Sequence, residues 1–378
     1  MSRARVHGGR IPRVGWVAAA LLAGAIVTVT GCASSAKPAD PSADPAAPSA
    51  ASPWLLMVSG QSGYAVWRSG SSSILMHTDD GWKDAENLTP LAVPTGGGLS
   101  LALGPGELAI GVDPVGRLTN SPLVTSSDGG HTWTPNELPG ALSGSRHSVA
   151  FAGPILTAVV GSNRGTLVEQ TSTGWRTLAD AGLVSAAPGL EIDSVVWASA
   201  RVGWLTGRNA QGVSGSPVVF MTIDGGATWS PVDAAAGTST AALAPCGAGS
   251  SWQLPVVGAD FTFRILRTND HGQTWTIGAS QPVRSQSPAW ACRGAQSWLI
   301  LKSGDLAVSR DAGASWQTIG PAPSSITDLA PDGSGNGLAA ATNKSRSVMY
   351  SITTSGSRFA EIALPTWLAK LAPRQDSD

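Results

Sequence analysis

The chain has 378 residues and a formal net charge of −1, and it contains 46 glycines and 26 prolines. Few segments have the apolar periodicity of helices, which excludes a mainly helical protein, and the glycines and prolines supply turns between strands. The charge balance argues against nucleic acid as the main partner, because such partners are held by a basic surface.

The N-terminus has the layout of a secretory signal, which we place at residues 1–31. Four arginines give a basic start, and an apolar run extends from Val14 to Thr30. The run is too short and too rich in small residues for a membrane-spanning helix. The tetrapeptide VTGC, which ends at Cys32, resembles the lipobox of bacterial lipoproteins and implies that Cys32 is lipidated. The alternative is an ordinary signal peptide followed by a cysteine without a role.

Residues 32–53 are expected to form a tether. After Cys32 this segment contains Ala, Ser, Pro and Asp with a single Lys37, and it has no large apolar side chain. It therefore cannot bury enough surface to offset its ordering entropy. A lipid anchor with this spacer predicts a body held at the outer face of a cytoplasmic membrane. Removal of the four signal arginines leaves 20 basic and 25 acidic residues, so the mature charge is −5.

One eight-residue pattern, Ser/Thr-x-Asp-x-Gly-x-x-Trp, occurs four times. Its defining residues are Ser126, Asp128, Gly130, Trp133, Thr222, Asp224, Gly226, Trp229, Thr268, Asp270, Gly272, Trp275, Ser309, Asp311, Gly313 and Trp316. The aspartates lie 96, 46 and 41 residues apart, which indicates a repeat of about 45 residues. Two decayed copies are read as shortened turns: HTDDGWKD (77–84), with Asp79 or Asp80, Gly81 and Trp82 as its aspartate, glycine and tryptophan, and QTSTGWRTL (170–178), which keeps Gly174 and Trp175. A third is TTSGSRFAEI (353–362), in which Phe359 replaces the tryptophan.

Each repeat also contains strand-like segments upstream of the pattern. A first apolar strand is followed by a second such as GWLTG (203–207), a third such as PVVFMT (217–222), and a fourth that begins at the tryptophan. Four short strands in each period of 40–50 residues are typical of a propeller blade. We therefore predict an all-β, seven-bladed β-propeller with four antiparallel strands per blade at residues 54–370, followed by a tail at 371–378. LPTWLAKLAP (364–373) is expected to form a short helix or a strand that closes the ring.

The repeats resemble the Asp-box (BNR) repeat, and most closely the version in the photosystem II assembly-factor-like and sortilin-like propellers. The segment SVVWASARVGWLTG…FMTIDGGATWSPV (194–232) matches a whole blade of that kind. This resemblance implies an assembly-factor style of role, in a chain that also carries a lipoprotein signal. The client of that family is photosynthetic, and nothing in this sequence indicates such a client.

We expect the Asp-box pattern to be structural. It falls in the hairpin between the third and fourth strands, where its hydroxyl and carboxylate can accept hydrogen bonds from turn amides. The glycine fits a position where a side chain would be strained, and the tryptophan can fold into the seam between blades. The alternative, in which the aspartates act as acids or metal ligands, is disfavoured because boxes in separate blades do not converge on one substrate.

Besides Cys32 the chain has only two cysteines, Cys246 and Cys292. Outside the membrane two thiols are expected to pair, and these occupy equivalent positions in adjacent repeats. Two free thiols are the alternative. The histidines are scattered, and no Cys-x-x-Cys occurs, so we predict no metal and no cofactor.

A sialidase-like glycoside hydrolase is the catalytic alternative, because sialidases carry Asp boxes on a six-bladed propeller. FRIL (263–266) superficially resembles the Phe-Arg-Ile-Pro motif of that family, but it lies in the fifth repeat and not at the start of the first blade. The family uses a tyrosine nucleophile, and only Tyr64 and Tyr350 exist, both in apolar strands. Spacing assembles no Ser-His-Asp set, and we assign no catalytic residue.

A non-catalytic protein-binding or assembly scaffold is the favoured function. Basic residues recur in the loops between second and third strands, on the face opposite the boxes. They are Arg68, Arg117, Arg164, Arg208, Lys302, Lys344 and Arg346. In an acidic chain they predict a positive ring for an acidic protein segment or an anionic envelope glycan. The alternative is that exposed loops simply collect arginines. We expect a monomer, no nucleic-acid partner, and a membrane contact through the lipid alone.

Overall fold

The computed structural model describes most of the chain between Trp54 and Thr366. The described residues are 54–57, 61–69, 72–90, 99–112, 121–143, 147–161, 165–179, 190–209, 217–232, 239–323, 325–343, 346–356, 358–363 and 365–366. The proposed signal, Cys32, the tether and the C-terminal tail lie outside these residues.

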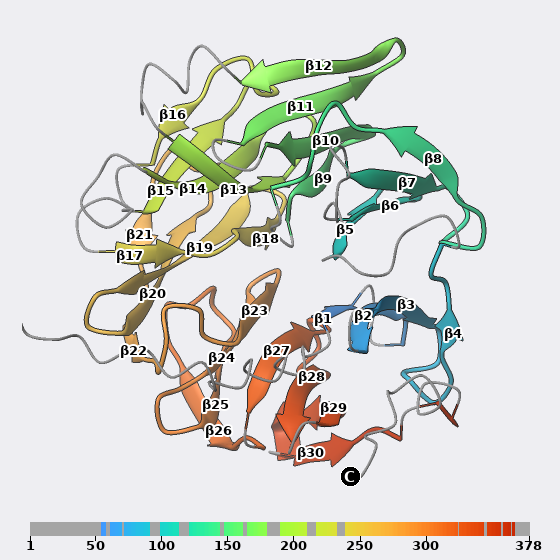
Figure 1. Cartoon of the computed structure of the whole chain (residues 1–378). Helices are drawn as coiled ribbons and strands as arrows, with labels where there is room; N and C mark the ends of the chain where they lie inside the picture. The colour runs from blue at the N-terminus through green and yellow to red at the C-terminus, as the bar shows by residue number, and fades with distance from the viewer. Residues whose placement is uncertain are drawn as a thin grey trace, which may run out of the picture. The chain divides into compact units, whose positions relative to one another are not determined.

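The described residues form seven antiparallel sheets that follow one another in chain order around a ring (Figure 1). The predicted seven-bladed propeller is therefore confirmed. Blade 1 has β1 (Trp54–Met57), β2 (Gly63–Ser69), β3 (Ser72–Thr78) and β4 (Glu86–Asn87). Blade 2 has β5 (Leu99–Gly104), β6 (Glu107–Val112), β7 (Pro122–Ser126) and β8 (Thr134–Glu137). Blade 3 has β9 (Val149–Ala152), β10 (Ile155–Val160), β11 (Thr166–Thr171) and β12 (Gly174–Ala179).

Blade 4 has β13 (Leu190–Trp197), β14 (Gly203–Asn209), β15 (Pro217–Thr222) and β16 (Ser230–Pro231). Blade 5 has β17 (Ser239–Ala242), β18 (Cys246–Ala248), β19 (Ser251–Gly258), β20 (Thr262–Thr268), β21 (Thr276–Ile277) and β22 (Gln281–Pro282). Blade 6 has β23 (Trp290–Arg293), β24 (Gln296–Ile300), β25 (Asp305–Ser309) and β26 (Gln317–Pro321). Blade 7 has β27 (Ile326–Pro331), β28 (Asn336–Asn343), β29 (Arg346–Thr353) and β30 (Arg358–Glu361).

Six blades have four strands that pair in sequence order, and blade 5 differs. Its first strand is divided into β17 and β18, which both pair with β19, and β22 adds to the edge of β20. A short 3-10 turn, η2 (Thr354–Gly356), lies between β29 and β30. In the described part of the chain, no helix is long and apolar enough to cross a membrane.

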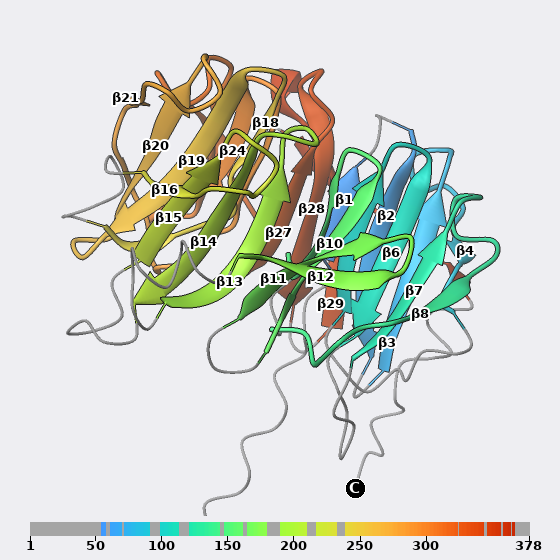
Figure 2. The same cartoon turned by 90° about the horizontal axis from the view of Figure 1, so that it is seen from above.

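The sheets are apolar on both faces because alternate residues of a strand point to opposite sides. In β2, Ala65 and Trp67 pack toward blade 7, whereas Tyr64 and Val66 pack toward blade 2. The buried residues accordingly form seven clusters, one in each seam between adjacent blades. Figure 2 shows the blades standing side by side, each covered by its neighbours.

The ring closes by packing of blade 1 on blade 7. Trp67 and Met76 of blade 1 share a cluster with Leu338 and Met349 of blade 7, and Ile362 packs against it. Each of these two blades is built from its own strands. Most of the segment 364–373, which was expected to close the ring, lies outside the described residues.

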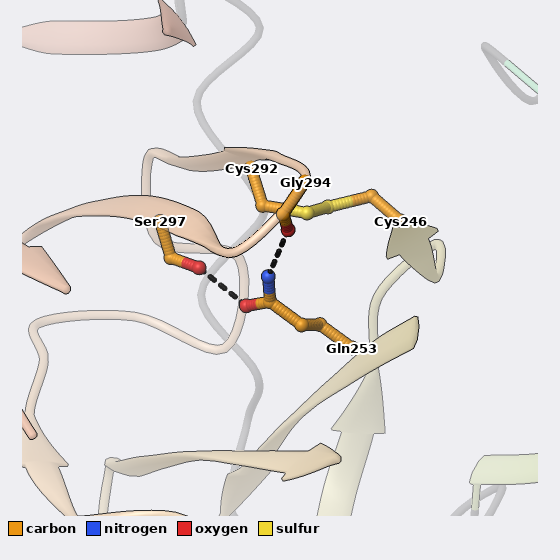
Figure 3. The surroundings of a disulfide bond; sticks show 5 residues. All are labelled: Cys246, Gln253, Cys292, Gly294 and Ser297. Atoms are coloured by element: carbon orange, nitrogen blue, oxygen red, sulfur yellow. Dashed lines mark hydrogen bonds between the residues drawn. A yellow bond between two sulfur atoms is a disulfide. The ribbon is translucent and has the colours of Figure 1, made fainter. Parts of the chain in front are cut away.

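Blades 5 and 6 are also joined by a disulfide between Cys246 of β18 and Cys292 of β23 (Figure 3). Their Cα atoms are 6.1 Å apart, which lies in the usual range for a bridge. Beside the bridge, the Gln253 amide donates to the carbonyl of Gly294 at 2.8 Å and accepts from the Ser297 hydroxyl. The disulfide therefore connects the first strands of these blades, and the Gln253 hydrogen bonds connect β19 of blade 5 to β24 and the β23–β24 turn of blade 6.

We expect the double variant Cys246→Ser with Cys292→Ser to unfold at lower urea concentration. The bridge closes a loop of 46 residues, and on the chain-entropy model its removal costs up to about 4 kcal/mol of unfolding free energy. Urea denaturation of oxidised wild type and of the variant measures this loss, with reduced wild type as the control. Equal stability of all three samples, or two free thiols in the unreduced protein by mass spectrometry, would contradict the assignment.

Candidate functional site

The four full copies of the Ser/Thr-x-Asp-x-Gly-x-x-Trp pattern form one recurring closed turn, called the box turn below, between the third and fourth strands of blades 2, 4, 5 and 6. In blade 2, the Ser126 hydroxyl donates to Asp128 Oδ1 over 2.7 Å and accepts from the amide of Gly130 at 2.8 Å. Asp128 also accepts from the Thr132 amide at 2.8 Å and from its hydroxyl at 2.6 Å. The corresponding bonds in blades 4, 5 and 6 measure 2.6–2.9 Å.

The hydroxyl directly before each tryptophan is part of this turn, and the sequence pattern had left its position open. It belongs to Thr132, Thr228, Thr274 and Ser315, which each donate to Oδ2 of the box aspartate at 2.6 Å. A signal for it was present, because all four copies carry Ser or Thr there. The aspartate is therefore held at both oxygens by side chains of its own turn.

The box glycine is required by space as well as by backbone angle. Its φ is +101° in Gly130 and +88° in Gly272, a region that side chains with a Cβ rarely adopt. A Cβ on Gly272 would lie 2.2 Å from the sulfur of Met221 in blade 4. The preceding position is also left-handed, and there His271 and Ala312 stand at φ +59° and +57° where blades 2 and 4 have glycine.

Each box tryptophan lies in the seam with the preceding blade. Trp229 is 8% exposed and packs edge-on against Trp197, with ring centroids 5.9 Å apart. The Trp133 indole donates to the carbonyl of Leu88 in blade 1 at 3.1 Å. Trp275 and Trp316 pack against the clusters of the 4–5 and 5–6 seams. The turns thus fasten each hairpin to its neighbouring blade.

The turn of blade 1 corrects the sequence interpretation, which treated HTDDGWKD as a shortened copy with Trp82 at the tryptophan position. Thr78 donates to Asp80 at 2.9 Å and accepts from the amide of Trp82 at 3.1 Å, and Asp84 donates to Asp80 at 3.0 Å. These bonds reproduce the full-length turn. Trp82 therefore occupies the glycine position, with φ +71°, and Ala85 occupies the tryptophan position.

The other two decayed copies keep an aromatic residue in the seam. The turn of blade 3 is shortened as expected, and its Trp175 donates to the carbonyl of Glu137 in blade 2 at 2.6 Å. In blade 7, Phe359 packs against the 6–7 cluster, where it meets Tyr350 edge-on.

The hydrogen bonds within the turns keep the box carboxylates ionised. Bonds from the hydroxyl and amide of Thr228, with a smaller one from Thr222, lower the pKa of Asp224 from 3.8 to about 2. The pKa of Asp128 is lowered by Thr132 and Ser126, and that of Asp270 by Thr268 and Thr274. Such low pKa values do not suit a general acid at neutral pH. Over the described ranges, no group of three or more His, Cys, Asp or Glu side chains could hold a metal ion.

A Ser-His-acid cluster that spacing did not reveal lies on blade 1. The Ser62 hydroxyl is 3.4 Å from His77 Nε2, and His77 Nδ1 is 3.0 Å from Glu86. The same Nε2 is also 3.4 Å from Asp79. The Ser–His separation exceeds the usual length of an O–H hydrogen bond, and Asp79 competes for the same nitrogen. We assign this cluster no catalytic role.

Both tyrosines pack against the seams: Tyr64 is buried, and Tyr350 is partly buried. Tyr64 is 7% exposed, stacks on His77 and donates to the carbonyl of Gly129 at 3.3 Å. Burial, with the charges of Asp79 and Glu86, raises its pKa, so its hydroxyl stays protonated at neutral pH. Tyr350 belongs to the 6–7 seam.

Two residues of the proposed basic ring have described side chains. Arg208 lies at the end of β14, where it faces Glu191 at 3.8 Å across the sheet. Lys302 is exposed in the β24–β25 turn, and the Arg284 guanidinium beside it donates to the Lys302 carbonyl at 2.6 Å. Arg117, Arg164 and Lys344, and the side chains of Arg68 and Arg346, lie outside the described residues.

Arg284 was missed by the sequence analysis because it precedes β23 and does not lie in a loop between second and third strands. The amide of Lys302 donates to the carbonyl of Pro282 at 2.8 Å, which brings the two connections together. Both lie at the end of their blades opposite the box turns. The described part of the basic face is therefore an Arg284–Lys302 pair and, on another blade, Arg208.

Comparisons with known proteins show a shared fold. No protein-family model matches the chain, and no curated protein matches it. The solved structure of YCF48 bound to D1 peptide is similar, with a TM-score of 0.53 and 16% identity over 77% of this chain and 91% of that chain. The protein lmo1340 of Listeria monocytogenes EGD-e matches with a TM-score of 0.51 and 9% identity over 83% and 94%.

A third similar structure comes from work on two prolyl endopeptidases, with a TM-score of 0.56 and 10% identity. It is matched over 82% of this chain, which spans about half (49%) of that longer chain. At these identities the similarities establish the propeller architecture, and the shared fold does not assign an activity.

We expect Thr228→Val to lower the unfolding free energy by about 1 kcal/mol or less near neutral pH, because one hydrogen bond to the carboxylate is lost. The pKa of Asp224 is depressed in the folded state. Its contribution is therefore complete above the unfolded value of 3.8 and is lost as the pH falls through about 2. Urea unfolding at pH 6 and pH 2 should show a difference from wild type that shrinks at pH 2. Thr134→Val, at an exposed strand position, is the control, and a loss that is equal at both pH values would contradict the account.

Proposed function

We propose that this protein is a lipid-anchored, extracytoplasmic propeller that binds a protein partner and acts as an assembly scaffold. Residues 1–31 serve as the signal, Cys32 carries the lipid, and residues 33–53 separate the propeller from the membrane. The basic start, the apolar run and the VTGC sequence support the anchor, and the propeller fold supports the scaffold.

The observation that carries the binding proposal is the Arg284–Lys302 pair. Both residues are exposed, and the Arg284 guanidinium donates to the Lys302 carbonyl, so two basic residues lie next to each other on this face. In a net-acidic chain a local positive patch attracts acidic segments and orients them as they approach. We propose an acidic peptide segment of another protein as the partner at this face.

The similarity to YCF48 supports this reading at the level of fold. That protein was solved with a D1 peptide bound, which shows that a propeller of this shape can hold a peptide. An anionic envelope glycan is the alternative ligand for the same cations, and direct binding measurements of an acidic peptide and of an anionic glycan to the wild type distinguish the two.

We expect Arg284→Glu with Lys302→Glu to abolish capture of the partner while leaving the melting temperature within the error of wild type. Crosslinking in intact cells followed by mass spectrometry identifies the wild-type partner, and pull-down then quantifies its loss. The control is Arg201→Glu with Arg310→Glu, which makes the same charge change on the box face. If the Arg284/Lys302 variant captured as much of the partner as the wild type does, the proposal would be wrong.

We expect Cys32→Ser to move the protein from the membrane fraction to the soluble fraction, because the thiol that accepts the lipid is absent. Fractionation of cells that express wild type and variant, together with mass analysis of the mature N-terminus, measures this. An unmodified Cys32 in the wild type, or a variant that stays in the membrane fraction, would contradict lipid anchoring.

A further inference from the structure

A cavity of about 500 Å³ lies in the seam between blades 7 and 1, on the face that carries the box turns. Its lining includes Gln61, Trp82, Asp332, Ser334, Asn336 and Thr353. These residues come from the β1–β2 connection, the blade 1 turn, the β27–β28 connection and the end of β29. Cavities of this size commonly accommodate small molecules.

The cavity lies where two degenerate box turns meet. In a regular turn, glycine allows close approach of the backbone and the tryptophan three residues later fills the seam. In blade 1 these two positions hold Trp82 and Ala85, as its hydrogen bonds show. In blade 7 the turn is replaced by η2. Trp82 is therefore the indole that is buried in the 7–1 seam, and it enters from the glycine position of the turn and also lines the cavity.

The wall of the cavity from blade 7 is an ordered polar loop. Asp332 accepts from the amide of Ser334 at 2.7 Å, from its hydroxyl at 2.8 Å, and from the amide of Asn336 at 3.1 Å. The Asn336 side-chain amide donates to the Ser334 hydroxyl at 3.2 Å. The loop therefore presents hydroxyl, amide and carboxylate groups from a fixed backbone, which reduces the entropy lost when a ligand binds.

The opposite wall contains Trp82, whose indole N–H is unpaired and whose backbone has a positive φ. Trp82 is 3% exposed, and its Nε1–H has no hydrogen-bond partner, although buried donors are normally paired. Trp204, Trp298 and Trp316 share this feature, but of these four indoles only Trp82 is among the residues that line the cavity. Its φ of +71° is also strained for a bulky residue, and such strain is often found at binding sites.

We propose that this seam cavity binds a neutral polyhydroxylated ligand, the terminal sugar residue of an uncharged glycan. Sugar hydroxyls both donate and accept hydrogen bonds, which matches the Asn336 amide, the Ser334 hydroxyl and the Asp332 carboxylate. Among the described residues that line the cavity none is Lys or Arg, and the carboxylate disfavours anionic ligands. The site goes beyond the proposed partner surface, since it lies on the opposite face.

Binding is tested on the full mature chain with methyl glycosides of glucose, galactose, mannose, fucose and N-acetylglucosamine, and with N-acetylneuraminic acid as the anionic probe. We expect saturable binding of at least one neutral glycoside by saturation-transfer NMR, and none of the anionic sugar. Ser334→Leu, which narrows the cavity, and Asn336→Ala should each weaken that binding at least tenfold. Thr173→Ala, in the blade 3 turn on the same face, is the control and should bind as wild type does.

A second readout follows ligand binding in the wild type itself. In ¹⁵N-labelled wild type, the indole N–H resonance of Trp82, assigned with Trp82→Phe, should shift during the glycoside titration. Absence of saturable binding by all neutral glycosides, equal binding by Ser334→Leu, or an unshifted Trp82 indole would overturn the proposal. The Arg284/Lys302 variant should bind glycosides normally, so failure of the sugar site and failure of the partner surface give separate results.

Discussion

The two apolar faces of every sheet are the constraint on which the rest of this structure depends. A small sheet with buried side chains on both faces is stable only when a neighbour covers each face. A linear row of such sheets would expose one apolar face at each end, and closure into a ring removes both. Blade 1 and blade 7 meet this constraint through Trp67, Met76, Leu338 and Met349, without exchanging strands.

The box turns follow from the same constraint. Each regular hairpin places an indole in the seam with the preceding blade, and some amides of its turn then have no partner in a strand. The hydroxyl and the carboxylate of the box accept hydrogen bonds from these amides. Because Asp128 and Asp224 are saturated by groups of their own turns, they stabilise hairpins and do not form a shared site. We therefore place the proposed binding sites at the connections on the opposite face and in the 7–1 seam, where Trp82 occupies the glycine position of the blade 1 turn.

The repeat period, the seven blades and the four strands per blade could be predicted because each depends on residues close in sequence. The register of the blade 1 turn was wrong because the tryptophan was taken as the marker, whereas Thr78 and Asp80 keep the spacing of the regular copies. The hydroxyl before the tryptophan was overlooked since the pattern left that position free. Arg284 beside Lys302, and the cavity at Trp82, depend on how distant connections meet, which the repeat pattern does not encode.

Hydrogen exchange at the box turns tests the central claim most directly. The amides of Gly130, Gly226, Gly272 and Gly313 donate to the first box hydroxyl, so they should exchange as slowly as amides of the flanking strands. Residue-resolved exchange on the native protein measures this. If all four glycine amides exchanged at the rate of open loops, the hydrogen bonds of the box turns would not stabilise the hairpins, which would contradict this account.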